Sequence, residues 1–212
     1  PVGILVVIGA IAILAFLKAQ EPTATNNAIW VDKSWTYADR SPQELDDYIN
    51  TLRYNQIGKV YAYVSSLNIN NNWMGGLSGD GSFMQSRENV TNFVANFKQK
   101  YPSAEVYGWI EIWTNLDTED GYRLDDEALQ ENVADFSLRM IEEMGFDGVF
   151  LDVKPLFTGS EDLLRLLRAV RAQVGLDTPI IVSVPADLTP NDQMVAPIDA
   201  IAPGTIWDKN FK

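Results

Sequence analysis

The feature that most constrains this chain is a regular alternation of two kinds of segment, which begins near Ala28. Short runs of β-branched and aromatic residues are each followed by a longer stretch with apolar residues at helical spacing. This alternation predicts βα units, in which parallel strands form one sheet and helices cover it. The predicted strands are residues 29–35, 59–66, 105–112, 148–154 and 179–185, and the predicted helices are 41–56, 86–100, 125–144 and 160–174.

Two of the predicted strand-to-helix connections are long and polar, whereas the helix-to-strand returns are short. Residues 67–84 are rich in Asn and Gly, and residues 113–124 are rich in acidic side chains. In a barrel, both connections would lie at the C-terminal ends of the strands, where active sites are built. A doubly wound nucleotide-binding sheet is the alternative, but residues 35–40, after the first strand, contain no G-x-G-x-x-G pattern.

The sequence therefore predicts an α/β fold of the (β/α)8 TIM-barrel type. A complete barrel has eight strands and typically about 250 residues. This chain of 212 residues would hold about five βα units of such a barrel. We accordingly expect a partial barrel, truncated at both ends.

The first residues form a separate apolar segment. Residues 1–17 carry no charge, and the first charged side chain is that of Lys18. A run of this length fits either a membrane span at its lower limit or the core of a signal peptide. A linker-like stretch rich in Gln, Pro, Thr and Asn follows. We expect a signal peptide core or transmembrane anchor at 1–19, a linker at 20–27 and a barrel domain at 28–212, outside the cytoplasm and either secreted or at the cell surface.

Charge and composition restrict the possible partners and chemistry. The formal net charge is −13, so the surface repels nucleic-acid phosphates and anionic lipids, and membrane contact is expected only through the N-terminal segment. The chain has no Cys and no His, which removes disulfides, thiolate nucleophiles and the commonest general base and metal ligands. Acid–base chemistry must rely on Asp, Glu, Lys or Tyr. We expect neither a metal nor a cofactor.

The densest chemical signal is the segment GFDGVFLDVKPL, residues 145–156. Within the predicted strand, the period-two rule places Phe150, Asp152 and Lys154 on one face. Asp152 and Lys154 then project together near the C-terminal end of the strand, which in a barrel is the mouth. An ion pair that closes the top layer of the barrel is the alternative to a functional pair, because buried charges normally occur paired.

This segment resembles the fourth-strand signature of family 18 glycoside hydrolases, the chitinase-like barrels, which reads D-G-x-D-x-D-x-E. Asp147, Gly148 and Asp152 match it, whereas Phe150 stands at the second Asp and Lys154 at the catalytic Glu. The segment is similar also to a looser group of barrel glycosidases with the pattern G-F-D-G-x-x-x-D-x-E-P, whose final proline is present here.

The resemblance implies a glycoside hydrolase-like barrel that acts on or binds an extracellular polysaccharide or oligosaccharide. In such enzymes the Glu protonates the glycosidic oxygen, and the neighbouring Asp orients the reacting group. Lysine, with an unperturbed pKa near 10.4, is a poor proton donor for this step, so Glu111, at the end of the third predicted strand, is the best substitute acid. The candidate catalytic residues are Asp152, Glu111 and Lys154. A non-catalytic carbohydrate-binding barrel is the first alternative, and a Schiff-base aldolase using Lys154 is the second.

Aromatic and acidic side chains near the predicted strand ends are candidates for ligand binding. Sugar rings have apolar faces that stack on indole rings, while their hydroxyls bond to carboxylates and amides. The candidate substrate-binding residues are Trp35, Trp73, Trp113, Asp32 and Asp187. We expect Asp32 to cluster with the candidate catalytic residues at one end of a curved parallel sheet.

Overall fold

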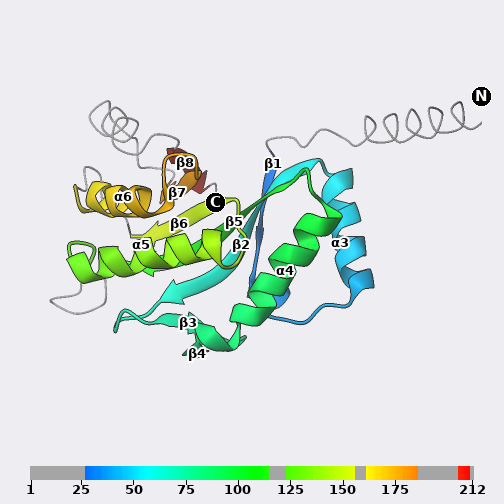
Figure 1. The fold of residues 1–212 in the computed structure, drawn as a ribbon, viewed down its shortest axis with the longest axis horizontal. Coiled ribbons are helices and arrows are strands. Elements are labelled where there is room, and N and C mark those ends of the chain that lie inside the picture. The colour runs from blue at the N-terminus through cyan, green and yellow to red at the C-terminus, as the bar shows by residue number, and fades with distance from the viewer. Residues whose placement is uncertain (1–26, 115–122, 156–160, 186–204, 211–212) are drawn as a thin grey trace, which may run out of the picture.

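The computed structural model describes residues 27–114, 123–155, 161–185 and 205–210. They form a sheet dominated by parallel strands, with helices packed against it (Figure 1). The strands are β1 (Asn27–Val31), β2 (Ile57–Leu67), β3 (Trp73–Gly75), β4 (Gly81–Ser82), β5 (Glu105–Trp113), β6 (Gly148–Lys154), β7 (Ile180–Pro185) and β8 (Thr205–Asn210). The helices are α2 (Lys33–Thr36), α3 (Pro42–Tyr54), α4 (Arg87–Lys100), α5 (Glu127–Glu142) and α6 (Glu161–Val174), with a 3-10 helix, η1, at Phe83–Gln85.

Apart from the short strands β3 and β4, neighbours in the sheet follow chain order. β1 pairs with β2, and β2, β5, β6, β7 and β8 follow as neighbours, every pair parallel. The short strands β3 and β4 form an antiparallel extension beside the end of β2. This is the sequential parallel order of consecutive βα units. The predicted α/β class and parallel sheet are confirmed.

The sheet is curved, because side chains from non-adjacent strands meet on one face. The ring of Tyr61 on β2 stacks on that of Phe150 on β6, with centroids 4.4 Å apart, although β5 lies between these strands. Trp30 on β1 approaches the same phenylalanine at 6.1 Å, edge to face. Parallel strands lie about 4.8 Å apart, so these contacts require a bent sheet. We call this side the concave face.

The other face of the sheet carries the main hydrophobic core. Alternate residues of the strands, such as Val60, Ile110 and Leu151, are fully buried there. They pack with one apolar stripe from each long helix, for example Leu129 of α5 and Leu166 of α6. The helix side is therefore closed by packing.

Helix starts follow the capping chemistry in the sequence. Ser41 and Glu44 form a reciprocal capping box at α3, with Pro42 at the first helical position. Asp126 caps α5 by accepting a hydrogen bond from the Ala128 N–H at 2.9 Å. These side chains satisfy N–H groups that a helix leaves without an internal partner.

Three predictions about elements need correction. The first strand ends at Val31, not at residue 35, because the Asp32 carboxylate accepts from the Ser34 N–H at 2.8 Å and starts α2. The connection 67–84 contains the β3–β4 hairpin and the start of η1. A further strand, Thr205–Asn210, pairs with β7 beyond the last strand that the sequence predicted.

The predicted N-terminal apolar segment and linker, residues 1–26, lie outside the described residues. Within the part of the chain that the structure describes, no helix combines the length and the apolar character needed to cross a membrane.

Candidate functional site

Strand register brings four polar side chains into one row on the concave face. Ser66 of β2 pairs with Glu111 of β5, Glu111 with Asp152 of β6, and Asp152 with Ser183 of β7. Directly paired residues of parallel strands point to the same side of a sheet. The row lies towards the C-terminal ends of the strands, the end at which βα-folds build their sites.

A bulge in β2 brings Ser66 into this row. Tyr63 pairs with Trp109, but the next pair on β5 is made by Ser65, so Val64 is the extra residue. Val64 is fully buried in the helix-side core. Because the bulge shifts the alternation by one residue, Ser66 pairs with Glu111. The period-two rule alone would not have predicted this.

Lys154 binds both carboxylates of the row. Its Nζ lies 2.9 Å from Glu111 Oε1 and 2.8 Å from Asp152 Oδ2. The same ammonium lies 4.9 Å from the centre of the Trp113 ring, and Trp113 is 46% exposed. We call Glu111, Asp152 and Lys154 the ion triad. It joins two neighbouring strands at the mouth of the concave face.

The environment of Lys154 keeps its side chain charged. Burial alone lowers the pKa of the amine, but hydrogen bonds to Asp152 and Glu111, together with their charges, outweigh it and raise the pKa above its ordinary value. An ammonium of this kind does not donate its proton readily near neutral pH. A Schiff base requires the neutral amine, so this geometry disfavours the aldolase alternative.

Tyr63 of β2 is a further residue of the site that the sequence analysis did not select. Burial is the main cause that raises the pKa of its phenol, a hydrogen bond with Ser66 opposes this, and the charge of Glu111 adds to it. Its ring packs edge to face on Trp109 at 5.1 Å. Tyr63 therefore lies within electrostatic reach of the ion triad.

Asp147, the first Asp of the family signature, lies at the other end of β6. Its Oδ2 accepts from the Val106 N–H at 2.8 Å, and its Oδ1 accepts from Lys98 Nζ at 2.6 Å. It thus ties the starts of two strands to α4. Phe150, at the position of the second signature Asp, is fully buried against Tyr61.

The candidate binding residues are dispersed. Trp113 lies at the ion triad, whereas Asp32 is exposed and serves as the cap of α2. Trp73 stacks on Phe136 of α5 at 4.1 Å, and its indole N–H donates to Asn132 at 3.0 Å. Asp187 lies outside the described residues.

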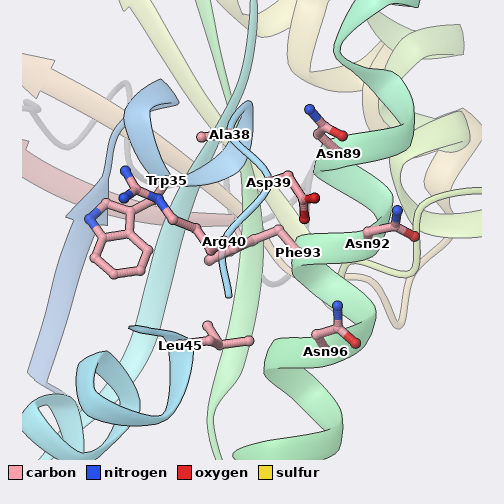
Figure 2. A pocket seen from close by; sticks show the side chains of 9 residues that line it. All are labelled: Trp35, Ala38, Asp39, Arg40, Leu45, Asn89, Asn92, Phe93 and Asn96. Carbon is pink, nitrogen blue, oxygen red and sulfur yellow. The ribbon is translucent and has the colours of Figure 1, made fainter. Parts of the chain in front are cut away.

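Trp35 faces the helices instead of the concave face. It stacks on Tyr48 of α3 at 4.2 Å, and the Arg40 guanidinium lies 4.7 Å from its ring centre. It lines a cavity of about 40 Å³, which has room for a few water molecules but not for a sugar ring. Figure 2 shows Trp35 and Arg40 on one side of this cavity and three asparagines of α4 on the other: Asn89, Asn92 and Asn96.

The described residues offer no group of three or more carboxylates arranged to hold a metal ion. Among the described residues, the mouth offers two carboxylates, one ammonium, hydroxyls and an indole face.

Comparison with known proteins assigns the fold. No family model and no curated protein sequence matches the chain. A class V chitinase from Nicotiana tobaccum matches with a TM-score of 0.57 and 14% identity, over 87% of this chain and 51% of that one. A GH18 chitinase from Cycas revoluta, in complex with allosamidin, matches with a TM-score of 0.55 and 12% identity, over 85% of this chain and 54% of that one. The Bacillus cereus spore cortex-lytic enzyme SleL matches with a TM-score of 0.52 and 11% identity, over 85% of this chain and 40% of that one.

These likenesses define the class of fold: it is that of the chitinase-like barrel glycosidases, and the predicted resemblance is confirmed at this level. The chain spans about half the length of the solved structures it matches. The tobacco chitinase has also been solved with a bound oligosaccharide, NAG4.

Proposed function

We propose that this protein binds an extracellular polysaccharide or oligosaccharide at the concave face of a glycosidase-type barrel, and that it does not hydrolyse this ligand by the acid catalysis of family 18. The observation that carries the proposal is the ion triad, in which Lys154 stands at the position of the family's catalytic Glu and bonds to Glu111 and Asp152 at 2.9 and 2.8 Å.

The loss of hydrolysis follows from proton chemistry. A general acid is effective when its pKa lies near the working pH. The two carboxylates beside Lys154 move its pKa upward, away from that range. Lys154 can instead donate a hydrogen bond to a sugar oxygen, because its ammonium has three N–H groups and the triad uses two of them.

Ligand binding is supported by the groups around the triad. Trp113 has an exposed indole, and indole faces stack on the apolar faces of sugar rings. The carboxylates accept hydrogen bonds from hydroxyls, and Ser66 and Ser183 can both donate and accept. The NAG4 complex of the tobacco chitinase makes a chain of amino sugars a suitable first ligand to test.

Hydrolysis with Glu111 as the acid is the second candidate function. It is favoured by one observation: Glu111 and Asp152 are directly paired across neighbouring strands, so two carboxyl groups lie close together at the mouth. Glycosidases use such a pair. Here, however, both carboxylates accept bonds from one ammonium.

The test uses the full chain with three groups of ligand: oligomers of β-linked amino sugars, galactosaminyl polymers and neutral glucans. Calorimetry measures binding, and reducing-end release measures hydrolysis. We expect binding to at least one group and no enzymatic release of reducing ends. Lys98→Ala is the matched control, because Lys98 also pairs with an Asp but at the opposite end of β6. It should bind as the natural protein does.

Rapid hydrolysis that is unchanged in Lys154→Ala would contradict the proposal. The acid would then be sought at Glu111, and Glu111→Gln should abolish turnover while leaving stacking on Trp113 intact.

A further inference from the structure

The ion triad carries an excess of negative charge. Two carboxylates face one ammonium, and Asp152 is only 7% exposed. A charge with restricted access to water is costly unless a counter-charge compensates it. Lys154 compensates one carboxylate in formal charge, so the triad keeps a net charge of about −1 at neutral pH. The chain as a whole, at −13, also attracts cations.

The triad also has unused hydrogen-bond acceptors. A carboxylate offers about four lone-pair sites. Within the described part of the chain, Glu111 and Asp152 each accept one bond, and both bonds come from Lys154. A ligand that supplies several donors fits this surplus better than one that supplies acceptors.

Ser183 is an independent indication that a hydrogen-bond donor fits beside Asp152. It pairs in register with Asp152 and so lies on the same face of the sheet. Ser183 is only 2% exposed, and its hydroxyl has no hydrogen-bond partner in the described structure. Buried polar groups without a partner are rare, so a donor placed beside Asp152 would satisfy the serine oxygen as well.

The geometry of Lys154 itself shows that this location suits an ammonium. Its nitrogen bonds to both carboxylates and lies over an indole ring. Carboxylates and aromatic faces together form the usual environment for ammonium groups in proteins. Glu111 and Trp113 are adjacent along β5 by the period of two, and Trp113 is 46% exposed.

We propose that the sugar bound at this site carries a free protonated amine, so that a de-N-acetylated amino sugar is preferred over its N-acetylated, neutral and acidic counterparts. This inference rests on the proposed function and names its ligand class. The sugar ammonium brings the charge of the triad to zero and donates to the free carboxylate oxygens and to Ser183. N-acetylation removes both the charge and two of the donors, and a uronic acid adds a repulsive charge.

Four tetrasaccharides test the preference by calorimetry. Three are the β-linked tetramers of glucosamine, N-acetylglucosamine and glucose, and the fourth is a galacturonic acid tetramer. At mildly acidic pH we expect the glucosamine tetramer to bind about tenfold more tightly than the N-acetylated one, as a charged hydrogen bond would give. The preference should shrink with added salt. Glu111→Gln should reduce it, whereas Glu131→Gln, on the outer surface of α5, should not.

The outcomes separate the two proposals. If the N-acetylated, neutral or acidic tetramer binds as tightly as the glucosamine tetramer or more tightly, the amine preference is wrong and the sugar-binding function stands. If Glu131→Gln reduces the preference as much as Glu111→Gln, the effect comes from overall charge and the inference also fails. If no saccharide binds, the proposed function fails together with the inference.

Discussion

The two ends of the concave face are built from the same strands, but aromatic side chains line one end and charged side chains line the other. At the strand starts, Tyr107 and Phe150 are almost fully buried, and the ring of Tyr61 lies 4.4 Å from that of Phe150 and 5.8 Å from that of Tyr107. At the strand ends, Glu111 and Lys154 take the corresponding places, with charged atoms that reach water. Between β5 and β6 the pairing is continuous from one end to the other.

This difference shows what each end does for the protein. The aromatic end closes the inside of the curved sheet, and Gly148 allows this because an added Cβ would lie 2.6 Å from the Tyr107 ring. The charged end is held by ion pairs and leaves Trp113 46% exposed. Stability should therefore depend mainly on the first end, and ligand chemistry on the second.

The largest expected effect is at the aromatic end. Phe150→Ala removes a fully buried ring that contacts three other aromatic side chains, so we expect a loss of about 3–5 kcal/mol in the free energy of unfolding. Chemical denaturation measures it. Trp113→Ala, at the exposed end, should cost far less stability. An equal cost for both substitutions would remove the distinction between the two ends.

A smaller effect is expected when the ammonium of the triad is removed. Lys154→Met leaves Glu111 and Asp152 beside each other without a counter-charge. Breaking a buried pair costs about 3–5 kcal/mol, but the Lys154 side chain is 34% exposed, so we expect about 1–3 kcal/mol at neutral pH. A variant as stable as the natural protein at every pH would show that the pair does not couple to folding.

The free energy of unfolding of the natural protein should fall as the pH rises into the alkaline range. Its carboxylate partners raise the pKa of Lys154 against the effect of burial. The stabilisation from this shift is fully present below the unfolded-state pKa of about 10.4 and is lost as the pH rises through the folded-state pKa. Urea midpoints measured across this range should fall more steeply for the natural protein than for Lys154→Met. Parallel curves would mean that Lys154 does not contribute.

The smallest effect is expected at the ion pair of the strand starts. Asp147→Asn keeps an oxygen that can accept from the Val106 N–H but loses the charge that pairs with Lys98. Both side chains are about one-third exposed, so we expect a loss of about 0.2–1 kcal/mol and unchanged saccharide binding. Asp152→Asn should instead alter binding, and calorimetry with the two variants compares the ends directly. Weaker binding by Asp147→Asn would show that the ends are not independent.

The sequence predicted most of the fold because helix and strand periods are local properties. The strand of residues 148–154 agrees with β6 at both ends, and the shared face of Asp152 and Lys154 follows from the period of two. The start of α2 was missed because the cap formed by Asp32 competes with the strand preference of Trp35. Strand alternation did not reveal Ser66, which depends on a bulge, and Ser183 was not selected because a serine in a buried strand carries no functional signal until its neighbours are known.

The roles of the aromatic residues were harder to predict for the same reason. Trp35, Trp73 and Trp113 all lie near predicted strand ends, yet only Trp113 contacts the ion triad. Trp35 packs on α3 and Trp73 on α5. Which helix covers a given ring depends on long-range packing, which residue spacing does not specify.

The most direct test of the account is a comparison of reducing-end release by the natural protein and by Lys154→Glu, with the saccharide that binds most tightly. A carboxyl group at residue 154 can hold a proton beside Asp152 and donate it to the glycosidic oxygen. We expect no enzymatic release by the natural protein and release by Lys154→Glu about 10²-fold to 10⁴-fold above background, the usual contribution of a general acid. Efficient hydrolysis by the natural protein, at a rate that neither Lys154→Glu nor Lys154→Ala changes, would contradict it.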